Sequence, residues 1–223
     1  VWCLRKKARS LDGETLMAKK SLSELYPSAS KIIRKYESVK QSGNPHLEPY
    51  YDELGKKWTV GFGRTLRDDQ IKGLSEAEIK KKYRMTAERA EADIDKQIQT
   101  SLEGIEYLKT QLPEGVSLNK GEIESLIPLI QNAGLGNIKE LNSGKPTKAI
   151  TALREGNKKK FMYELFDPNE GIVSAGGAKQ LGLQRRRLEE GSIAKVYEGG
   201  EFNRKSGGRI MNQTQLNYNK QRF

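Results

Sequence analysis

Apolar residues recur at helical spacing near the beginning of the chain, in residues 28–43. They fall on one face of a helix: Ile32, Ile33, Tyr36 and Val39. Serines precede this face as candidate caps, and Gly43 follows it as a stop. The pattern predicts an amphipathic helix with Glu37 near its end.

A different periodicity follows in residues 50–66, YYDELGKKWTVGFGRTL. Large apolar residues alternate there with smaller ones: Trp58, Val60 and Phe62 with Thr59, Gly61 and Gly63. Such alternation is typical of a half-buried strand, so we predict a small hairpin with one apolar face and one face that presents Thr59 and bare backbone. The preceding residues 41–49 are expected to form a loop because of their Gly, Asn and Pro content.

The remaining chain has helical periodicity. Residues 85–108 fit a long amphipathic helix with a break near Thr86, and Ser75 with Glu78 fits a capping box before it. Further helices are expected in three segments: 120–134, 145–156 and 178–197. Internal repeats and separating linkers are absent from the sequence. The chain therefore reads as one α+β, predominantly helical domain with a small hairpin lobe and a larger lobe, and everything beyond the hairpin is expected to be helix.

Composition narrows the function classes. The 223 residues are 35% hydrophobic and 31% charged, and no run of about twenty apolar residues exists to span a bilayer. The single Cys3 excludes an internal disulfide framework, and His46 as the single imidazole leaves no zinc-ligand spacing, so we expect no metal site. The net charge of +11 predicts attraction to polyanions, which include nucleic acids, anionic cell-wall polymers and lipid head groups.

The hairpin and the helix before it carry residues suited to cleaving a bond between two sugars. That reaction needs a carboxylic acid to protonate the leaving oxygen, and a second group to hold a water or to stabilise the cationic transition state. Glu37 can be the acid and Asp52 the second carboxylate, with the Thr59 hydroxyl positioning water. Gly61 and Gly63 would let the backbone pass close to a sugar chain.

The same residues carry a family resemblance. A Glu on a helix followed by YYDELGKKWTVGFG resembles the Glu, Asp and Thr constellation of the phage-type lysozymes, which are endolysin muramidases. Later segments are similar in the same order. IQNAGLGNI is similar to a helix with an Asn or Gln facing the substrate, LNSGKPTKAITALREGN to the helix pair that follows, and GLQRRRLEE to the closing Gly-Leu, Arg-Arg, Glu pattern. The resemblance spans residues 32–194 and implies a lysozyme-like fold.

The resemblance implies roles for five residues. Glu37 would be the general acid, and Asp52 and Thr59 would handle the attacking water. Asn132 and Arg186 would be the substrate-binding residues, with Asn132 touching a sugar and Arg186 lying near the acid. Members of the family hydrolyse the β-1,4 bond between N-acetylmuramic acid and N-acetylglucosamine, with inversion and without a cofactor.

The chain departs from the family pattern at two places. Extra residues around KQSGNP lengthen the loop between Glu37 and the hairpin. Arg64 stands where the family usually has a His after the second hairpin glycine. Because that His is structural in the family, we expect a changed ion pair rather than lost activity.

Each candidate also has an ordinary structural interpretation. A Glu such as Glu37 is far more often a solvated surface carboxylate than a catalyst, while Asp52 suits a turn and Thr59 a strand. Asn132 beside Gly134 could serve as a helix cap. It is the combined spacing of Glu, Asp and Thr that favours the catalytic interpretation.

Other conspicuous residues are expected to be structural. Arginines 185–187 cannot all point inward on one helix, so any of them could pair with Glu189 or Glu190. Trp58 is expected in the core, because it shares a strand face with two apolar residues. His46 is expected in a loop without a function.

Three functions compete. The first is a peptidoglycan hydrolase that a bacteriophage uses for host wall degradation or lysis. The second is a catalytically silent lysozyme-like binding or structural module of a phage particle, against which the complete set of catalytic residue types argues. The third, a nucleic-acid binder, would need interleaved aromatic and basic residues on strands or a helix-turn-helix pattern, and it ranks last because neither is found.

Partners and location follow from the first function. The expected partner is bacterial peptidoglycan. The N-terminal residues lack the apolar centre of a secretory signal. The enzyme would therefore pass from the host cytoplasm to the periplasm and wall through a pore made by a phage protein, or arrive in the virion with other virion proteins.

Three regions are expected along the chain. Residues 1–16 would be an irregular extension, with the native product beginning at Met17. A lysozyme-like catalytic domain would occupy residues 17–201. Residues 202–223 would form a basic tail, because they contain no acidic residue.

Overall fold

The computed structural model describes residues 20–195 except 54, 142, 169–170 and 176–177. The described helices are α1 (Leu22–Leu25), α2 (Pro27–Tyr36), α3 (Asp68–Ile71), α4 (Glu76–Tyr83), α5 (Ala87–Lys109), α6 (Lys120–Ala133), α7 (Leu135–Lys139), α8 (Lys148–Arg154), α9 (Lys158–Phe166) and α10 (Leu181–Ile193), with a 3-10 turn η1 (Val39–Gln41). The described strands are β1 (His46–Asp52), β2 (Lys57–Gly61), β3 (Arg64–Thr65), β4 (Ser174–Ala175) and β5 (Ala178–Lys179). The predicted α+β, predominantly helical class is confirmed.

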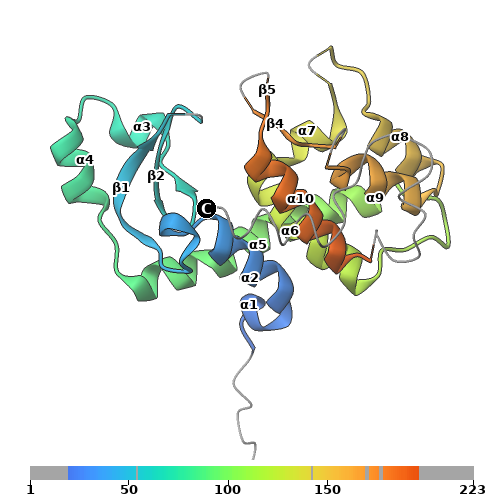
Figure 1. Cartoon of the computed structure of the whole chain (residues 1–223), viewed down its shortest axis with the longest axis horizontal. Helices are drawn as coiled ribbons and strands as arrows, with labels where there is room; N and C mark the ends of the chain where they lie inside the picture. Colours follow the sequence, from blue (N-terminus) through green and yellow to red (C-terminus); the bar gives the residue numbers. More distant parts are fainter. Residues whose placement is uncertain (1–19, 54, 142, 169–170, 176–177, 196–223) are drawn as a thin grey trace, which may run out of the picture.

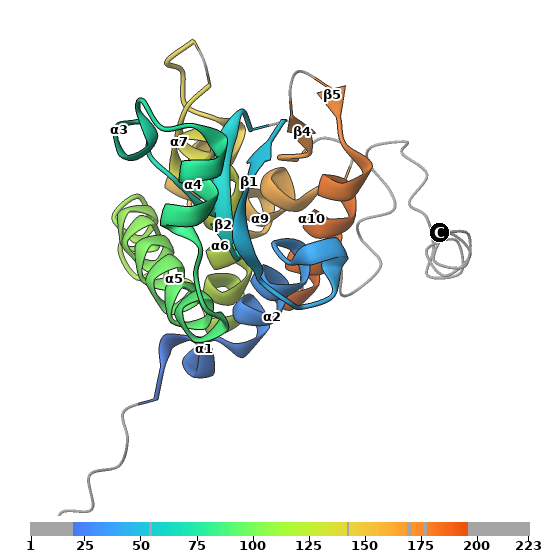
Figure 2. The same ribbon diagram turned by 90° about the vertical axis from the view of Figure 1, so that its left-hand side faces the viewer.

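The two predicted lobes are visible in Figure 1, where β1, β2, α3 and α4 lie on one side and α7 to α10 on the other. The long helix α5 runs between them, and its 23 residues extend about 34 Å at 1.5 Å per residue. Seen at a right angle in Figure 2, α5 lies along one flank of the hairpin and α10 along the other. No helix in the described ranges is long and apolar enough to cross a membrane.

The first predicted helix is shorter than its apolar pattern suggested. Helix α2 starts with Pro27 at its first position and ends at Tyr36, with Glu37 as its C-cap. The serines predicted as its caps, Ser28 and Ser30, lie inside the helix, and the N-cap residue Tyr26 makes no side-chain cap bond. Gly43 is not the stop, since the backbone already leaves the helix after Glu37, and Lys40 has φ +48°. The placement of Glu37 at the end of a helix is confirmed.

The predicted hairpin is confirmed, although its first strand starts earlier than expected. Strand β1 begins at His46, so the loop predicted over residues 41–49 is wrong for its last four positions. The pairing of β1 with β2 is irregular between His46 and Tyr50, where the strand contains Pro49. Proline cannot donate to a strand ladder and is tolerated on an edge strand, which is the position of β1 in the order β1-β2-β3.

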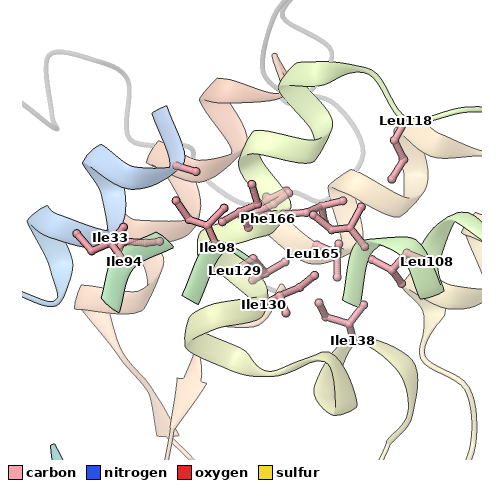
Figure 3. Close-up of a cluster of buried hydrophobic side chains, with 14 of the residues drawn as sticks. Ile33, Ile94, Ile98, Leu108, Leu118, Leu129, Ile130, Ile138, Leu165 and Phe166 are labelled. Carbon is pink, nitrogen blue, oxygen red and sulfur yellow. The ribbon is translucent and has the colours of Figure 1, made fainter. Parts of the chain in front are cut away.

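Strand β2 buries the apolar face that the alternation predicted. Val60 and Phe62 are fully buried, and Trp58 is half-buried against the same core. Helix α5 contacts β2 and packs in turn against α6, which also packs against α2 and α10. Figure 3 shows side chains from several helices converging around α6, among them Ile33, Ile98 and Phe166. The apolar face of the hairpin therefore packs into the same hydrophobic core as the helices.

The helical lobe confirms most of the predicted segments and corrects two points. Thr86 caps α5 after a break that separates it from α4, as predicted. The expectation that everything beyond the hairpin is helix is wrong, because β4 and β5 form a second small sheet. Strands of two residues are too short to leave a periodic signal. Helix α9 was also missed: its first turn is a lysine run, although Phe161 and Leu165 behind it are buried.

Residues 1–19 and 196–223 lie outside the described residues. The extension over residues 1–16, the start at Met17 and the basic tail over residues 202–223 therefore stay predictions.

Candidate functional site

Glu37 lies where the hairpin lobe meets the helical lobe. As the C-cap of α2 it is placed by the last backbone bond of that helix, from the Glu37 N–H to the Ile33 carbonyl at 2.9 Å. Its side chain is only 17% exposed, and its Oε1 accepts a hydrogen bond from Arg186 Nη1 at 2.5 Å. Its Oε2 lies against Gly63, where an added Cβ would be 2.8 Å away. The carboxylate is thus fixed on one side by α10 and on the other by the hairpin.

Arg186 is the centre of a buried ionic network. Its guanidinium donates through Nε to Glu190 Oε1 at 2.9 Å and through Nη2 to the Pro128 carbonyl at 3.2 Å and Gln131 Oε1 at 3.1 Å. Burial works to lower the pKa of Arg186, but the negative charges of Glu190 and Glu37 outweigh it and raise that pKa. Arg186 is therefore a permanent positive charge that orients Glu37.

A second buried arginine supports the first. Arg187 donates to the other oxygen of Glu190, to the Ile172 carbonyl at 2.9 Å and to Asn132 Oδ1 at 2.5 Å. Arg187 and Glu190 are both fully buried. The network thus links α10 to α6, which is the helix that carries Gln131 and Asn132.

Tyr36 lies beside the same arginine. The Arg186 guanidinium carbon is 5.4 Å from the centre of the Tyr36 ring, which permits a cation–π contact. Burial, followed by the negative charge of Glu189 and a hydrogen bond to it, raises the pKa of Tyr36 well above its usual range. Glu189 also forms an ion pair with Lys35 of α2. Two ion pairs therefore join the end of α2 to α10: Glu37 with Arg186, and Lys35 with Glu189.

Asp52 and Thr59 lie on the hairpin. Thr59 is directly opposite Tyr50 in the ladder, and Asp52 is opposite Lys57. Since side chains two residues apart share a strand face, Tyr50, Asp52 and Thr59 lie on one face. Thr59 is only 7% exposed. The Asp52 carboxylate folds back toward the turn, where a Cβ on Gly55 would be 2.6 Å from its Oδ2.

Tyr50 lies near enough to Glu37 and Asp52 for both carboxylates to affect its pKa. Burial raises the pKa of Tyr50 most, and the negative charges of Glu37 and then Asp52 raise it further. The phenol therefore experiences both charges. The rings of His46 and Tyr50 are in tilted contact, with centres 4.3 Å apart. Burial lowers the pKa of His46, while a hydrogen bond to the Ser38 backbone and the charge of Glu37 act to raise it.

A cavity of about 740 Å³ opens beside Glu37. Its wall includes Gly63, which adjoins the Glu37 carboxylate, Gln131, which accepts from the same Arg186, and a face of α5. Arg64 also lines it and pairs with Asp93 of α5 at 3.1 Å. The ion pair expected at Arg64 is thus present.

Comparison with known proteins identifies the family. The model of the family described as phage lysozyme matches residues 40–190, which is more than half of the chain. The chain belongs to the phage lysozyme family. This membership supports a lysozyme-like peptidoglycan hydrolase. No curated protein sequence matches the chain.

Solved structures of phage lysozymes and their relatives share the fold. The active form of the endolysin Lyz of phage P1 is 18% identical and superposes with a TM-score of 0.57 over 78% of this chain and 86% of that one. The endolysin of Escherichia coli O157:H7 phage FAHEc1 is 21% identical, with a TM-score of 0.50 over 74% of this chain and 89% of that one. At these identities the similarity establishes the fold of this phage lysozyme and no residue's role.

The structure unites some of the predicted residues and separates others. Glu37 and Arg186 are in direct contact, whereas Asn132 is an exposed residue whose side-chain oxygen is taken by Arg187. Asp52 and Thr59 share the hairpin face beside Tyr50.

Two residues of the site, Tyr50 and Gln131, were missed by sequence reasoning. The pairing expected between the arginine run and Glu189 or Glu190 is confirmed by the contacts of Arg186 and Arg187 with Glu190, but sequence cannot reveal which arginines are buried. The three arginines do not all face inward, as expected. Arg186 and Arg187 are buried, and Arg185 is partly exposed.

Proposed function

We propose that this phage lysozyme is a muramidase that cleaves the β-1,4 bond between N-acetylmuramic acid and N-acetylglucosamine, with Glu37 as general acid. The observation that carries the proposal is the Glu37 carboxylate, largely buried at the lobe junction and held through Oε1 by Arg186 at 2.5 Å. Since Arg186 occupies Oε1, the proton is assigned to Oε2, on the side of Gly63. Arg186 then stabilises the carboxylate that remains after the proton has moved to the leaving oxygen.

Asp52 and Thr59 are assigned to the attacking water. Both side chains belong to the hairpin face next to Tyr50. A carboxylate can accept a proton from water, and a hydroxyl can orient it. Water held on the opposite side of the sugar ring from the acid gives inversion, without a covalent intermediate and without a cofactor.

The two predicted substrate-binding residues receive different roles. Asn132 offers its amide NH₂ group to a sugar oxygen, because its carbonyl oxygen already accepts from Arg187. Arg186 acts on the substrate through Glu37, since it is 3% exposed and its donors are engaged by Glu37, Glu190 and α6. It is a positioning residue.

The biological setting we propose is degradation of a bacterial host wall by a bacteriophage. The catalytic domain would span residues 17–201, and the protein would act on peptidoglycan after passing through a phage-made pore or as part of the virion. The net charge of +11 would favour encounter with the acidic wall.

Hydrolysis of purified peptidoglycan tests the proposal. We expect new reducing ends at N-acetylmuramic acid, and NMR of fresh digests should show the α anomer first, because inversion of a β bond yields α. Absence of hydrolysis by wild-type protein that is folded by circular dichroism would support the catalytically silent binding module instead. Early accumulation of the β anomer would contradict the inverting mechanism alone.

A further inference from the structure

The ion pair between Arg186 and Glu37 opposes the role proposed for Glu37. A general acid must hold its proton before the reaction, and a neighbouring cation favours the ionised form instead. Arg186 Nη1 is 2.5 Å from Glu37 Oε1, and Arg186 is 3% exposed, so water screens little of the attraction. A negative charge that compensates Arg186 is therefore required if Glu37 is to keep a proton near neutral pH.

Glu190 supplies this charge from one turn further along α10. It is fully buried, and its Oε1 accepts from Arg186 Nε at 2.9 Å. Glu37 and Glu190 thus bind two different nitrogens of one guanidinium. Burial acts to lower the pKa of Arg186, whereas the negative charge of Glu190, and then that of Glu37, raises it. Glu190 is therefore the stronger counter-ion of Arg186.

Arg187 keeps Glu190 ionised. A lone carboxyl at this depth would take up a proton, because burial disfavours its charged form. Arg187 is fully buried too, and its Nη1 donates to Glu190 Oε2, the oxygen that Arg186 does not bind. The two arginines exceed Glu190 by one positive charge while Glu37 is protonated. Without Glu190 that excess would double, and the proton of Glu37 would be lost more readily.

Other titratable groups face Glu37 from strand β1. His46 and Tyr50 lie close enough for the charge of Glu37 to act on them, and Asp52 follows on the same strand. Burial lowers the pKa of His46 below its usual 6.5, and burial raises that of Tyr50 above its usual 10.0. Both side chains are therefore neutral between about pH 7 and pH 9, so a change of activity in this range does not report them.

A second set of groups surrounds Arg186 outside the buried network. Glu189 pairs with Lys35, and both side chains are more than a third exposed, so water weakens their fields. Tyr36 contacts the Arg186 guanidinium, and burial, followed by the charge of Glu189, raises its pKa well above its usual range. Tyr36 is therefore neutral, and the pair of Glu189 and Lys35 adds no net charge beside Arg186.

We infer that Glu190 is a positioning residue for catalysis: it compensates Arg186 through Nε and so allows Glu37 to carry the proton that the leaving oxygen receives. The inference rests on the proposed function and deepens it. Glu190 acts through Arg186, which binds both carboxylates. Removal of the Glu190 charge should therefore change the pH at which Glu37 loses its proton, an effect that a purely structural contact would not have.

The pH dependence of kcat/KM on soluble peptidoglycan strands tests this role. Activity that needs a protonated acid falls as pH rises, and the midpoint of this alkaline limb reports the acid in the free enzyme. Glu190→Gln keeps the size of the side chain but removes its charge, and we expect its alkaline midpoint to lie about one pH unit below that of wild type. An unchanged midpoint, with the rate lowered equally at every pH, would reduce Glu190 to a structural contact and overturn the inference.

Two controls separate local charge from overall charge and from packing. Glu103→Gln removes the same charge from the exposed face of α5 and should keep the wild-type midpoint. The double variant Arg187→Met, Glu190→Gln removes one charge of each sign, so its midpoint should return at least halfway to that of wild type. A midpoint that drops equally in Glu103→Gln, or that stays fully shifted in the double variant, would contradict compensation by Glu190.

NMR of the side-chain carboxyl carbons tests the inference without hydrolysis. Wild-type protein that cleaves no peptidoglycan would defeat the proposed function, yet the spectra of Glu37 in wild type and in Glu190→Gln would still show whether its titration midpoint differs by about one pH unit. Should Glu190→Gln not fold by circular dichroism, wild-type spectra decide. An ionised Glu190 at pH 7 supports compensation of Arg186, and a protonated Glu190 overturns it.

Discussion

The two sides of the candidate site are built differently. On the helical side, Glu37 is held by Arg186, whose remaining donors go to Glu190 and α6, so that three helices meet in one buried network. On the hairpin side, Asp52 and Thr59 are placed by the β1–β2 ladder and its turn. The first arrangement joins residues 149 positions apart, and the second joins neighbours on one hairpin.

This difference predicts which side of the site tolerates substitutions better. Removing one member of a buried charge network leaves its partner without compensation, which makes the helical side intolerant of change. The hairpin side loses less when altered, because Asp52 is partly exposed, where water can replace a lost partner, and Thr59 carries no charge. We expect substitutions on the helical side to cost more, in stability or in activity, than those on the hairpin side.

The largest expected effect breaks the network itself. Arg187→Met removes a fully buried charge that faces Glu190, and we expect the free energy of unfolding to fall by about 4 kcal/mol. A drop of this size corresponds to about 10 °C in the melting temperature of a domain this large. Urea and thermal unfolding followed by circular dichroism would measure it.

Arg185 provides the matched control for that measurement. It is the neighbouring arginine and partly exposed, so Arg185→Met should change stability by less than about 0.5 kcal/mol. Equal stability of the Arg187→Met variant and wild type would show that apolar packing replaces the ion pair, and the proposed contrast between the two sides would be lost.

Glu37→Gln tests the chemical role of the helical side. The substitution keeps size and shape but removes the transferable proton, so wall-lytic activity should fall by at least about two orders of magnitude while the fold persists. Glu103→Gln on the exposed face of α5 is the control and should be as active as wild type. A Glu37→Gln enzyme with full activity on purified peptidoglycan would exclude Glu37 as the acid.

Asp52→Asn applies the same change to the hairpin side. The neutral amide can no longer accept a proton from water, and we expect at least a tenfold loss, roughly, though a smaller one than for Glu37→Gln. Thr59→Ala should cost less again, because it removes an orienting hydroxyl and not a charge. Rates of reducing-end release would rank the three variants, and a larger loss for Thr59→Ala than for Asp52→Asn would make the hydroxyl the main holder of water.

The smallest effect concerns pH. Burial lowers the pKa of His46 below its usual value of 6.5, so the unfolded chain binds a proton there more readily than the folded one. The free energy of unfolding should therefore fall as pH drops below 6.5, and His46→Gln should lack this component. Urea unfolding at pH 7.5 and 5.5 would measure the two slopes, which this single histidine allows to be compared directly. Identical slopes would mean that His46 titrates alike in both states.

Local patterns predicted the parts that depend on local physics. The hairpin followed from strict alternation, the start of α4 from the Ser75 and Glu78 capping box, and the position of Glu37 from the end of an apolar helical face. The length of α2 did not follow, because the apolar Val39 continued the helical pattern into residues that form a 3-10 turn. The start of β1 did not follow either, since Gly, Asn and Pro content indicates a loop whether or not a neighbouring strand is available for pairing.

The sequence by itself determined which residues could do chemistry and which faces had to be buried, because residue type and periodicity are properties of neighbours along the chain. Only the tertiary structure decided that Arg187 is buried beside Arg186, that Asn132 accepts from Arg187, and that four cations line one cavity. These contacts join residues tens of positions apart, and their geometry depends on how α2, α5, α6 and α10 pack. Burial then sets the strength of each charge pair, because the cost of removing a charge from water varies with its depth in the fold and not with its place in the chain.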